Sequence, residues 1–404
     1  MLSTLEAAPV TGVNGRGIAA RRPTLIHWTP PFLVHLASNV LFWYAAHRHG
    51  FDWLKAATHA RYDAFQYLSI ARNGYRAEHC PPEMSVPGLT EACGNIGWFP
   101  LYPLVLRPVH DLFGLDWAVA GVVVAEVCLL GVLLLLWHLL GARATARNVA
   151  CLALAACWPG AIYYHATFPI ALSVLLALVT WTLLSRGWWA LAGLAGMLTA
   201  MTYSISALIA PAMLAYLFLT RSRGSWTWLR QAVVACGLTS LGVAATFALL
   251  WHDTGRPMVF MDYHRRWGGG LHNPVTSYRE LLHALPVPGT GPHAWPVPKV
   301  ITTLGWELHA ALALVVVAVL VVAVEAARGR ANALDVALTL YGFLIFTVPL
   351  IVGPHITQSR SHALMLPVVL VLRRLPAVGS GLFALAAVPL AYALGVLFLV
   401  STLV

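Results

Sequence analysis

Long apolar runs dominate the pattern of hydrophobic and polar positions along the chain. Uninterrupted stretches at 117–140, 231–251, 303–324 and 379–403 are each long enough to cross the hydrocarbon core of a bilayer as a helix. No segment alternates with the period of two that a membrane β-barrel requires. Because only helices and closed barrels satisfy every backbone group in lipid, the pattern predicts an all-α polytopic membrane protein.

Two further apolar segments, 148–184 and 187–219, are each too long for one straight helix. Pro159 and Pro169 interrupt the first, and the polar stretch "TAMTYSISA" (199–207) interrupts the second. These segments fit either two long kinked spans or four short ones. We favour four, which gives about eleven membrane spans in total.

Composition supports the membrane class and changes the meaning of the charge. The chain is 59% hydrophobic and 10% charged, against roughly 25% charged residues in a soluble domain. Its net charge of +10 therefore reflects topology rather than nucleic-acid binding. Arginines cluster in short connections, which the positive-inside rule assigns to the cytoplasmic side. They are Arg16, Arg21, Arg22, Arg143, Arg147, Arg221, Arg223, Arg230, Arg328, Arg330, Arg373 and Arg374.

This topology predicts a cytoplasmic tail (1–24) without the apolar core of a cleaved signal, followed by one transmembrane domain (25–404). Two long polar segments, 48–115 and 253–302, then face outward on the same side. Within the first, the proline-interrupted segment 97–114 is amphipathic and suits the outer interface. The second is rich in aromatic residues, so we expect it to fold back onto the membrane surface.

Cys80 and Cys93 both fall in the first outward segment. Outside the cytoplasm a disulfide between them would close a short loop and contribute roughly 3 kcal/mol in the chain-entropy model. Two free thiols are the alternative. The other four cysteines lie in apolar segments and are predicted to be core thiols.

Acids are scarce, fifteen in the whole chain, and Asp63 is the best placed for chemistry. It opens a predicted helix within "RYDAFQYLSIARNGY" (61–75), at the outer end of the first membrane span. Local sequence alone favours a structural role for it. Gln66 three residues later completes a capping-box pattern, and Gly74 stands where the helix would end.

"YDAFQYLSIARNGY" followed by "WFPLYPLVLR" resembles the signature of the PIG-V family of polyprenyl-phosphate-mannose-dependent mannosyltransferases. In that family W/Y-D-x-x-x-Y-L-x-I-A-x-x-G-Y leads, after a variable loop, into F-F-P-L-Y-P. The matching residues are Asp63, Tyr67, Leu68, Ile70, Ala71, Gly74, Tyr75, Phe99, Pro100, Leu101, Tyr102 and Pro103. Weaker similarity continues in 254–268 and 358–367, where Arg360 falls on the arginine of an S-x-x-R-Y segment.

The chain also departs from the family pattern. Phe168, Pro169 and Ile170 replace an acid-bearing triplet, Ser361 replaces the tyrosine after the arginine, and "TAMTYSISA" lacks an arginine often found there. These differences leave the reaction class intact and put the acceptor in doubt.

The resemblance implies a GT-C-like bundle whose two extracytoplasmic loops carry interfacial helices, and a sugar that arrives on a polyprenyl phosphate. One carboxylate, Asp63, suffices as general base for a single inverting displacement. The leaving phosphate needs positive hydrogen-bond donors. The candidates for this role are Arg360, Arg265, Arg266, His165 and His355. Residues that would orient the base or bind substrate are Gln66, Tyr67, Trp98, Tyr102 and Trp267.

Several of these residues have a competing structural interpretation. Arg265 and Arg266 would equally snorkel toward lipid headgroups, and His165 beside two tyrosines suits packing at the interface. Trp98 and Tyr102 suit an aromatic belt at the headgroup level.

The implied partners are a polyprenyl-phosphate sugar donor, a glycolipid or lipoglycan acceptor and the bilayer. The histidines are scattered and no D-x-D pair occurs, so we expect no metal and no other cofactor. Lys55 and Lys299 are the only lysines, a bias typical of a GC-rich bacterial genome. We therefore expect the plasma membrane, with a cytoplasmic N-terminus and an extracytoplasmic active site; a eukaryotic protein would lie in the endoplasmic reticulum.

Other functions stay open at this point. The sugar could be arabinose or glucose instead of mannose, and the acceptor could be a protein hydroxyl. A lipid or glycolipid transporter would also use many spans and broken helices. A non-catalytic assembly subunit would tolerate replacement of Asp63.

Overall fold

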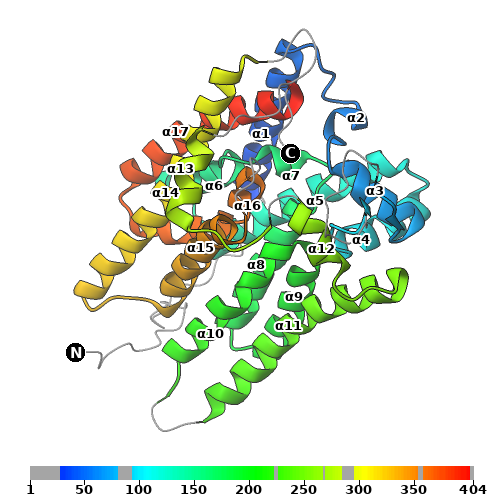
Figure 1. Cartoon of the computed structure of the whole chain (residues 1–404). Coiled ribbons are helices and arrows are strands. Elements are labelled where there is room, and N and C mark those ends of the chain that lie inside the picture. The colour runs from blue at the N-terminus through cyan, green and yellow to red at the C-terminus, as the bar shows by residue number, and fades with distance from the viewer. Residues whose placement is uncertain are drawn as a thin grey trace.

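The computed structural model describes residues 28–80, 93–222, 226–266, 269–283, 295–353 and 358–400 (Figure 1). Within these ranges the chain is helical apart from turns and one short antiparallel ribbon. The ribbon pairs β1 (Ala77–Glu78) with β2 (Cys93–Gly94). The predicted all-α class is confirmed; the predicted tail (1–24) lies outside the described residues.

The helices follow one another with short connections. In chain order they are α1 (Thr29–Arg48), α2 (Ala56–His59), α3 (Ala64–Asn73), α4 (Leu101–Phe113), α5 (Trp117–Leu139), α6 (Ala146–Ala156), α7 (Ile162–His165), α8 (Ile170–Ser185), α9 (Trp189–Thr202), η3 (Ser204–Leu208), α10 (Ile209–Leu219), α11 (Thr227–Thr254), α12 (Val259–Arg266), α13 (Pro274–His283), α14 (Val297–Ala327), α15 (Ala333–Val352), α16 (Gln358–Ala363), η4 (Leu366–Arg374) and α17 (Ala377–Val400).

Five of the described helices, α5, α11, α14, α15 and α17, are long and apolar enough to cross a membrane. They include the four apolar runs predicted from the sequence, and they make this a multi-pass membrane protein. The two overlong segments are divided into four shorter apolar helices, α6, α8, α9 and η3–α10, none of which reaches the length of the five candidate spans, so the total of about eleven spans stays a prediction. The breaks fall around Pro159 and Pro169 and at Tyr203, where the backbone turns extended.

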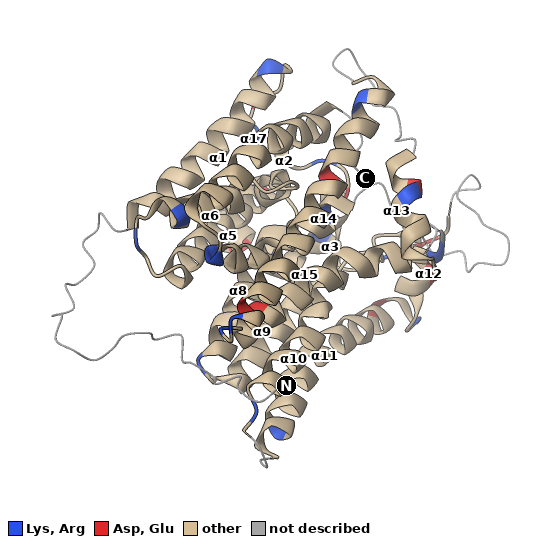
Figure 2. Ribbon diagram, turned by 90° about the vertical axis from the view of Figure 1, so that its left-hand side faces the viewer, with Lys and Arg blue, Asp and Glu red and all other residues tan. Residues whose placement is uncertain are grey.

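In Figure 1, α8, α9 and α11 lie side by side, and α10 packs against α11 and α15. A second group is formed by α14, α15 and η4, while α17 packs against α1 and α6. The helices of the first outward segment, α2, α3 and α4, gather at one side of this bundle. Few charged residues lie along the helices, and most of each helix consists of uncharged residues (Figure 2).

The arginine-bearing connections meet at one end of the bundle. Arg147 at the start of α6, Arg328 after α14 and Arg373 at the end of η4 line a common pocket. Asp335, at the start of α15, pairs with Arg373 at 2.6 Å, whereas Arg360 lies in α16, which follows the other end of α15. These three arginine-bearing parts of the chain and Asp63, which pairs with Arg360, therefore lie at opposite ends of the bundle; the side of the membrane that each end faces stays a prediction.

The outward segments fold as compact attachments to the bundle. The amphipathic helix α4, which is not among the candidate spans, leaves Leu112 and Phe113 largely exposed. A disulfide joins Cys80 and Cys93 beside the ribbon. In the second segment α12 packs on α11, and α13 packs on α14 and α15.

Candidate active site

Asp63 occupies the N-cap position of α3, but its side chain makes no capping hydrogen bond. Its carboxylate instead accepts from Nη1 of Arg360, 297 residues away along the chain. Both side chains are largely buried, with 16% of Asp63 and 12% of Arg360 exposed. The capping box that the local sequence favours is therefore wrong for this carboxylate, which faces another helix.

The backbone before Asp63 is held in an uncommon conformation. Tyr62 has φ of +52°, a region that residues with bulky side chains rarely adopt. Its hydroxyl donates to the carbonyl oxygen of Phe398 in α17 at 2.7 Å, and the two rings meet edge to face. The anchored Tyr62 thus sets the direction in which the chain enters α3, and with it the position of Asp63.

The two halves of the PIG-V-like signature pack against each other. Arg107 donates to the carbonyl oxygens of Ala71 at 2.7 Å and Ile70 at 3.1 Å, which satisfies the last turn of α3. The rings of Tyr67 and Tyr102 meet edge to face at 5.7 Å. Most of the signature therefore builds a platform that holds α3 in place beneath Asp63.

The end of α3 is fixed in the same way. Gly74 ends the helix at φ of +74°, as predicted. The hydroxyl of Tyr75 donates to the carbonyl oxygen of Trp98 at 2.7 Å. Burial raises the pKa of Tyr75, so this hydroxyl stays protonated and keeps donating at physiological pH.

Arg360 is positioned by a close contact between α16 and the broken segment before α7. Gly160 has φ of +87°, and a Cβ there would lie 2.5 Å from the carbonyl oxygen of Ser359. Trp158 donates to the carbonyl oxygen of His362 at 2.9 Å, and Tyr164 to that of Ala363 at 2.6 Å. Gly160, the last residue of "WPG", thus allows the backbone before α7 to lie closer to α16 than any residue with a Cβ would permit.

A buried carboxylate–imidazole pair supports the other side of α16. His362 Nδ1 lies 2.7 Å from Glu307 Oε1 of α14, and both side chains are nearly inaccessible. The ring of His362 also stacks on Phe346 at 5.4 Å. Such a pair resists separation, because either partner alone would leave a buried polar group unsatisfied.

Arg360 also lines a cavity of about 530 Å³ enclosed by η3, α12, the end of α15 and α16. Polar groups are contributed by Tyr203, His264, Arg265 and Gln358, and most of the remaining lining is apolar. An apolar recess with a few converging polar groups is the usual form of a ligand site. This one combines guanidinium groups for an anion with a wall suited to a lipid chain.

Of the other predicted phosphate ligands, Arg265 lies at this cavity. It is 60% exposed and has a 3.4 Å contact with Asp262 one turn earlier in α12. The side chain of Arg266, Trp267 and His355 lie outside the described residues.

The structure corrects the assignment of His165 as a phosphate ligand. Its ring is inaccessible and both nitrogens are used: Nδ1 lies 2.7 Å from Glu126 Oε1 and Nε2 lies 2.8 Å from Ser38 Oγ. His35 adds a 3.2 Å contact to the other Glu126 oxygen. His165 therefore belongs to a buried polar network between α1, α5 and α7, away from the cavity.

The aromatic candidates also prove to be part of the scaffold. Tyr102 is inaccessible, and its hydroxyl donates to the carbonyl oxygen of Gly121 at 3.2 Å. Trp98 packs against Tyr263 at 5.4 Å, and Tyr67 is buried between Tyr102 and Phe168. Gln66 lies half-buried in the first turn of α3. Substrate contacts from Trp98 and Tyr102 are thus not supported by their positions.

One part of the cavity wall was not predicted as a site, although the sequence contains a signal for it. The polar interruption "TAMTYSISA" forms the bend from α9 into η3, and Tyr203, Ser204 and Ala207 line the cavity. Polar residues that break an apolar span mark a site that must be buried in protein or face a cavity. No group of three or more His, Cys, Asp or Glu side chains suited to a metal ion occurs among the described residues.

Comparison with known proteins gives a structural similarity alone. No family model and no curated sequence matches the chain. Its structure is similar to that of ArnT from Cupriavidus metallidurans in the apo state, with a TM-score of 0.47 and 16% identity over 87% of this chain. It is also similar to an oligosaccharyltransferase from Archaeoglobus fulgidus tethered to an acceptor peptide, with a TM-score of 0.46 and 13% identity over 92% of this chain. The matches cover 59% and 55% of those two longer chains.

Proposed function

We propose that the protein is a membrane glycosyltransferase that moves a sugar, mannose in the first instance, from a polyprenyl phosphate to an acceptor hydroxyl. The reaction would take place at the extracytoplasmic face and invert the anomeric centre. Asp63 serves as general base, and Arg360 with Arg265 binds the donor phosphate.

The observation that carries this proposal is the contact between Asp63 and Arg360. The sequence singled out one as a base and the other as a phosphate ligand, and their side chains meet from helices 297 residues apart. Arg360 in turn lines the cavity that Arg265 also lines. A base beside a phosphate site is the arrangement that a displacement of phosphate by an alcohol requires.

The reaction needs one proton transfer and one displacement. The acceptor oxygen attacks the anomeric carbon from the face opposite the phosphate, while Asp63 takes the hydroxyl proton. The bond between the anomeric carbon and the phosphate oxygen breaks, and polyprenyl phosphate leaves with the bonding electron pair. Guanidinium donors stabilise the charge that develops on the leaving oxygen.

The ion pair suggests how donor binding prepares the base. The two charges of Asp63 and Arg360 satisfy each other in a largely buried position. A donor phosphate that takes over the guanidinium leaves the carboxylate free to accept a proton from the acceptor. Binding of the donor would therefore precede binding of a productive acceptor.

Mannose and a glycolipid or lipoglycan acceptor follow from the PIG-V-like signature, in which Asp63, Tyr67, Gly74 and the "WFPLYP" segment match. The described geometry is equally compatible with arabinose or glucose, and with a protein acceptor. What it favours is the reaction class: an anionic lipid-linked donor and a carboxylate base.

The decisive assay uses the purified full-length protein, radiolabelled polyprenyl-phosphate-mannose and a panel of lipid acceptors. We expect transfer that persists in EDTA and that Asp63→Asn abolishes. Normal turnover by a folded Asp63→Asn protein would remove the catalytic assignment. Exclusive use of a nucleotide sugar would remove the reaction class.

One observation favours a lipid or glycolipid transporter as the second candidate. The buried network of Glu126, His165, His35 and Asn39 places ionisable groups inside the helical bundle, as in many transporters. Proteoliposomes that carry a fluorescent lipid distinguish the two functions. Loss of lipid movement in Glu126→Gln, with no sugar transfer by the wild type, would favour the transporter.

A further inference from the structure

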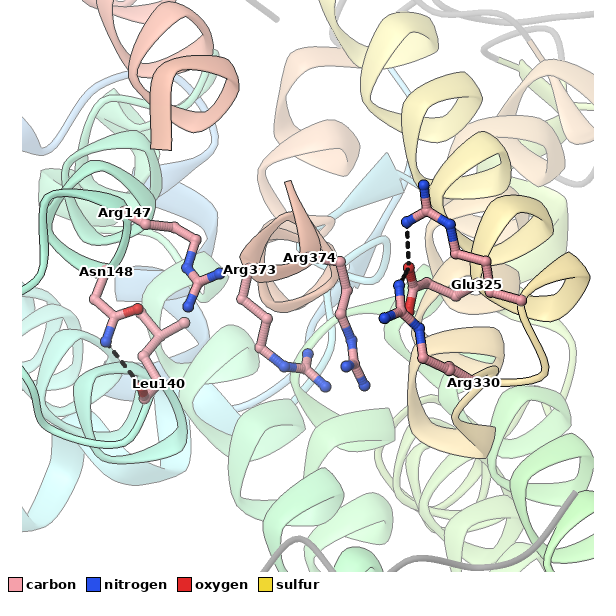
Figure 3. Close-up of a pocket in the computed structure, with 8 residues that line it drawn as sticks. Leu140, Arg147, Asn148, Glu325, Arg330, Arg373 and Arg374 are labelled. Atoms are coloured by element: carbon pink, nitrogen blue, oxygen red, sulfur yellow. Dashed lines mark hydrogen bonds and ion pairs between the residues drawn. The ribbon is translucent and has the colours of Figure 1, made fainter. Parts of the chain in front are cut away.

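A second pocket, of about 390 Å³, lies at the opposite end of the bundle from Asp63. Residues in the α5–α6 and α14–α15 connections and in the adjoining ends of α6, α14 and η4 line it: Leu140, Arg147, Asn148, Glu325, Arg328, Arg330, Arg373 and Arg374. We call it the basic pocket. Figure 3 shows Arg147 on one side, Glu325 and Arg330 on the other, and Arg373 and Arg374 between them.

The charges in the basic pocket do not balance. Glu325 contacts Arg330 at 2.9 Å and Arg328 at 3.3 Å. Asp335 contacts Arg373 at 2.6 Å and Arg374 at 2.9 Å. Each carboxylate thus serves two guanidinium groups. Arg147 has no carboxylate within 4 Å in the described part of the chain, so five arginines face two acids.

Exposed arginines in connecting loops are ordinary in membrane proteins, because they set the topology. These arginines differ because three separate parts of the chain bring them to the edge of one hollow, where Arg147, Arg328 and Arg330 still remain exposed. Like charges that converge repel one another unless an anion lies between them.

We propose that the basic pocket binds a phosphate group, and that its source is the headgroup of an anionic phospholipid in the adjoining leaflet. Guanidinium groups match phosphate oxygens in charge and geometry, and basic pockets between helix ends on this side of a membrane bind such headgroups. A free phosphate has the same chemistry and is the other source to test. The site is separate from the cavity that Arg360 lines and does not depend on the transferase proposal.

The test measures binding to full-length protein in detergent by titration calorimetry. The probes are dioctanoyl-phosphatidylglycerol, dioctanoyl-phosphatidylcholine as the neutral comparison, and inorganic phosphate. The variant is Arg147→Gln, chosen because Arg147 is exposed and holds no acid, so the fold should persist. We expect it to weaken binding of the anionic lipid about fivefold, the attraction of one basic residue near a membrane surface.

Arg143→Gln is the matched control, since Arg143 lies in the same connection, is exposed and does not line the pocket. It should change the dissociation constant by less than about twofold, and Arg147→Lys should keep most of the affinity. Weakening of phosphate binding alone by Arg147→Gln would support the site with a free phosphate as its ligand. Equal effects of Arg143→Gln and Arg147→Gln, or no saturable binding of either anion, would overturn the proposal.

Discussion

The Asp63 site and the basic pocket place charged residues at opposite ends of the apolar bundle, but they differ in how acids and arginines are matched. At Asp63 one acid meets one arginine, both largely buried, and the arginine also lines a mostly apolar cavity. Five arginines line the basic pocket, and four of them pair with two acids, Glu325 in its wall and Asp335 beside it; most of the arginine side chains remain accessible. A balanced pair can be displaced by a substrate, whereas an excess of one sign attracts a lasting counter-ion.

The helices between the two sites keep them apart. Asp335 lies at the start of α15 and contacts two arginines of the basic pocket. Val348 and Val352, near the end of the same helix, line the cavity that Arg360 also lines. Along a helix, 1.5 Å per residue puts these positions on the order of 20 Å apart. Charge changes in one site should therefore leave the other nearly unaffected.

The largest effect is expected for Asp63→Asn. Without a proton acceptor, kcat should fall by about 10²–10⁴-fold, the usual contribution of a general base. Sugar transfer from polyprenyl-phosphate-mannose measures it, and thermal unfolding checks the fold. Asp111→Asn, an exposed acid in the same outward segment, should retain activity. Equal activity in both variants would refute the role of Asp63.

Replacement of Arg360 comes next. Arg360→Gln should reduce donor use more than tenfold, because a charged hydrogen bond contributes about 1.5–3 kcal/mol. Arg360→Lys should recover part of this loss, since lysine keeps the charge but lacks the fork. In a double-mutant cycle the effects of Asp63→Asn and Arg360→Gln on stability should be strongly non-additive, because the two side chains are in contact. Additive stability effects would contradict the pairing.

A backbone test separates position from charge. Gly160→Ala adds a Cβ against Ser359 at positive φ, so it should cost about 1–3 kcal/mol of stability and impair transfer by displacing Arg360. Gly187→Ala is the matched control: its φ is +78°, but no atom lies within 4 Å of the added Cβ. It should carry the strain without the loss of activity. Equal loss in both variants would show that α16 is not held by this contact.

The smallest effect concerns salt. Raising sodium chloride from about 0.05 to 0.5 M shortens the Debye length, so anion binding to the accessible basic pocket should weaken severalfold. The largely buried Asp63–Arg360 pair is screened much less. The donor concentration that gives half-maximal sugar transfer should therefore shift less than the anionic-lipid concentration that half-saturates the basic pocket. Parallel titrations of the two ligands on one preparation provide the comparison. A larger shift at the Asp63 site would reverse the contrast drawn above.

Much of the fold followed from the sequence because lipid leaves few alternatives. Apolar runs of membrane length became α5, α11, α14 and α17, and prolines predicted the breaks around α7. The capping-box pattern of Asp63 and Gln66 was misleading. An N-cap side chain reaches the amides of its own helix only when the backbone before the helix enters in a suitable direction. The anchored turn at Tyr62 redirects Asp63 toward α16, and nothing in residues 61–75 reveals that contact.

The site was predicted residue by residue but not as an arrangement. Asp63 and Arg360 could each be singled out, but their contact spans 297 positions and has no periodic signature. His165 was misassigned because its partners, Glu126 and Ser38, are 39 and 127 positions away. The convergence of three arginine connections was hidden for the same reason, since the positive-inside rule assigns a side of the membrane and not a neighbour.

The hydrogen bond from Tyr62 to Phe398 joins positions 336 residues apart, and it has a consequence for biosynthesis. The turn that aims Asp63 emerges early from the ribosome, whereas its anchor belongs to α17. A nascent chain would therefore carry an unformed base until that helix has entered the bilayer, and the protein should become competent only after its final membrane insertion step.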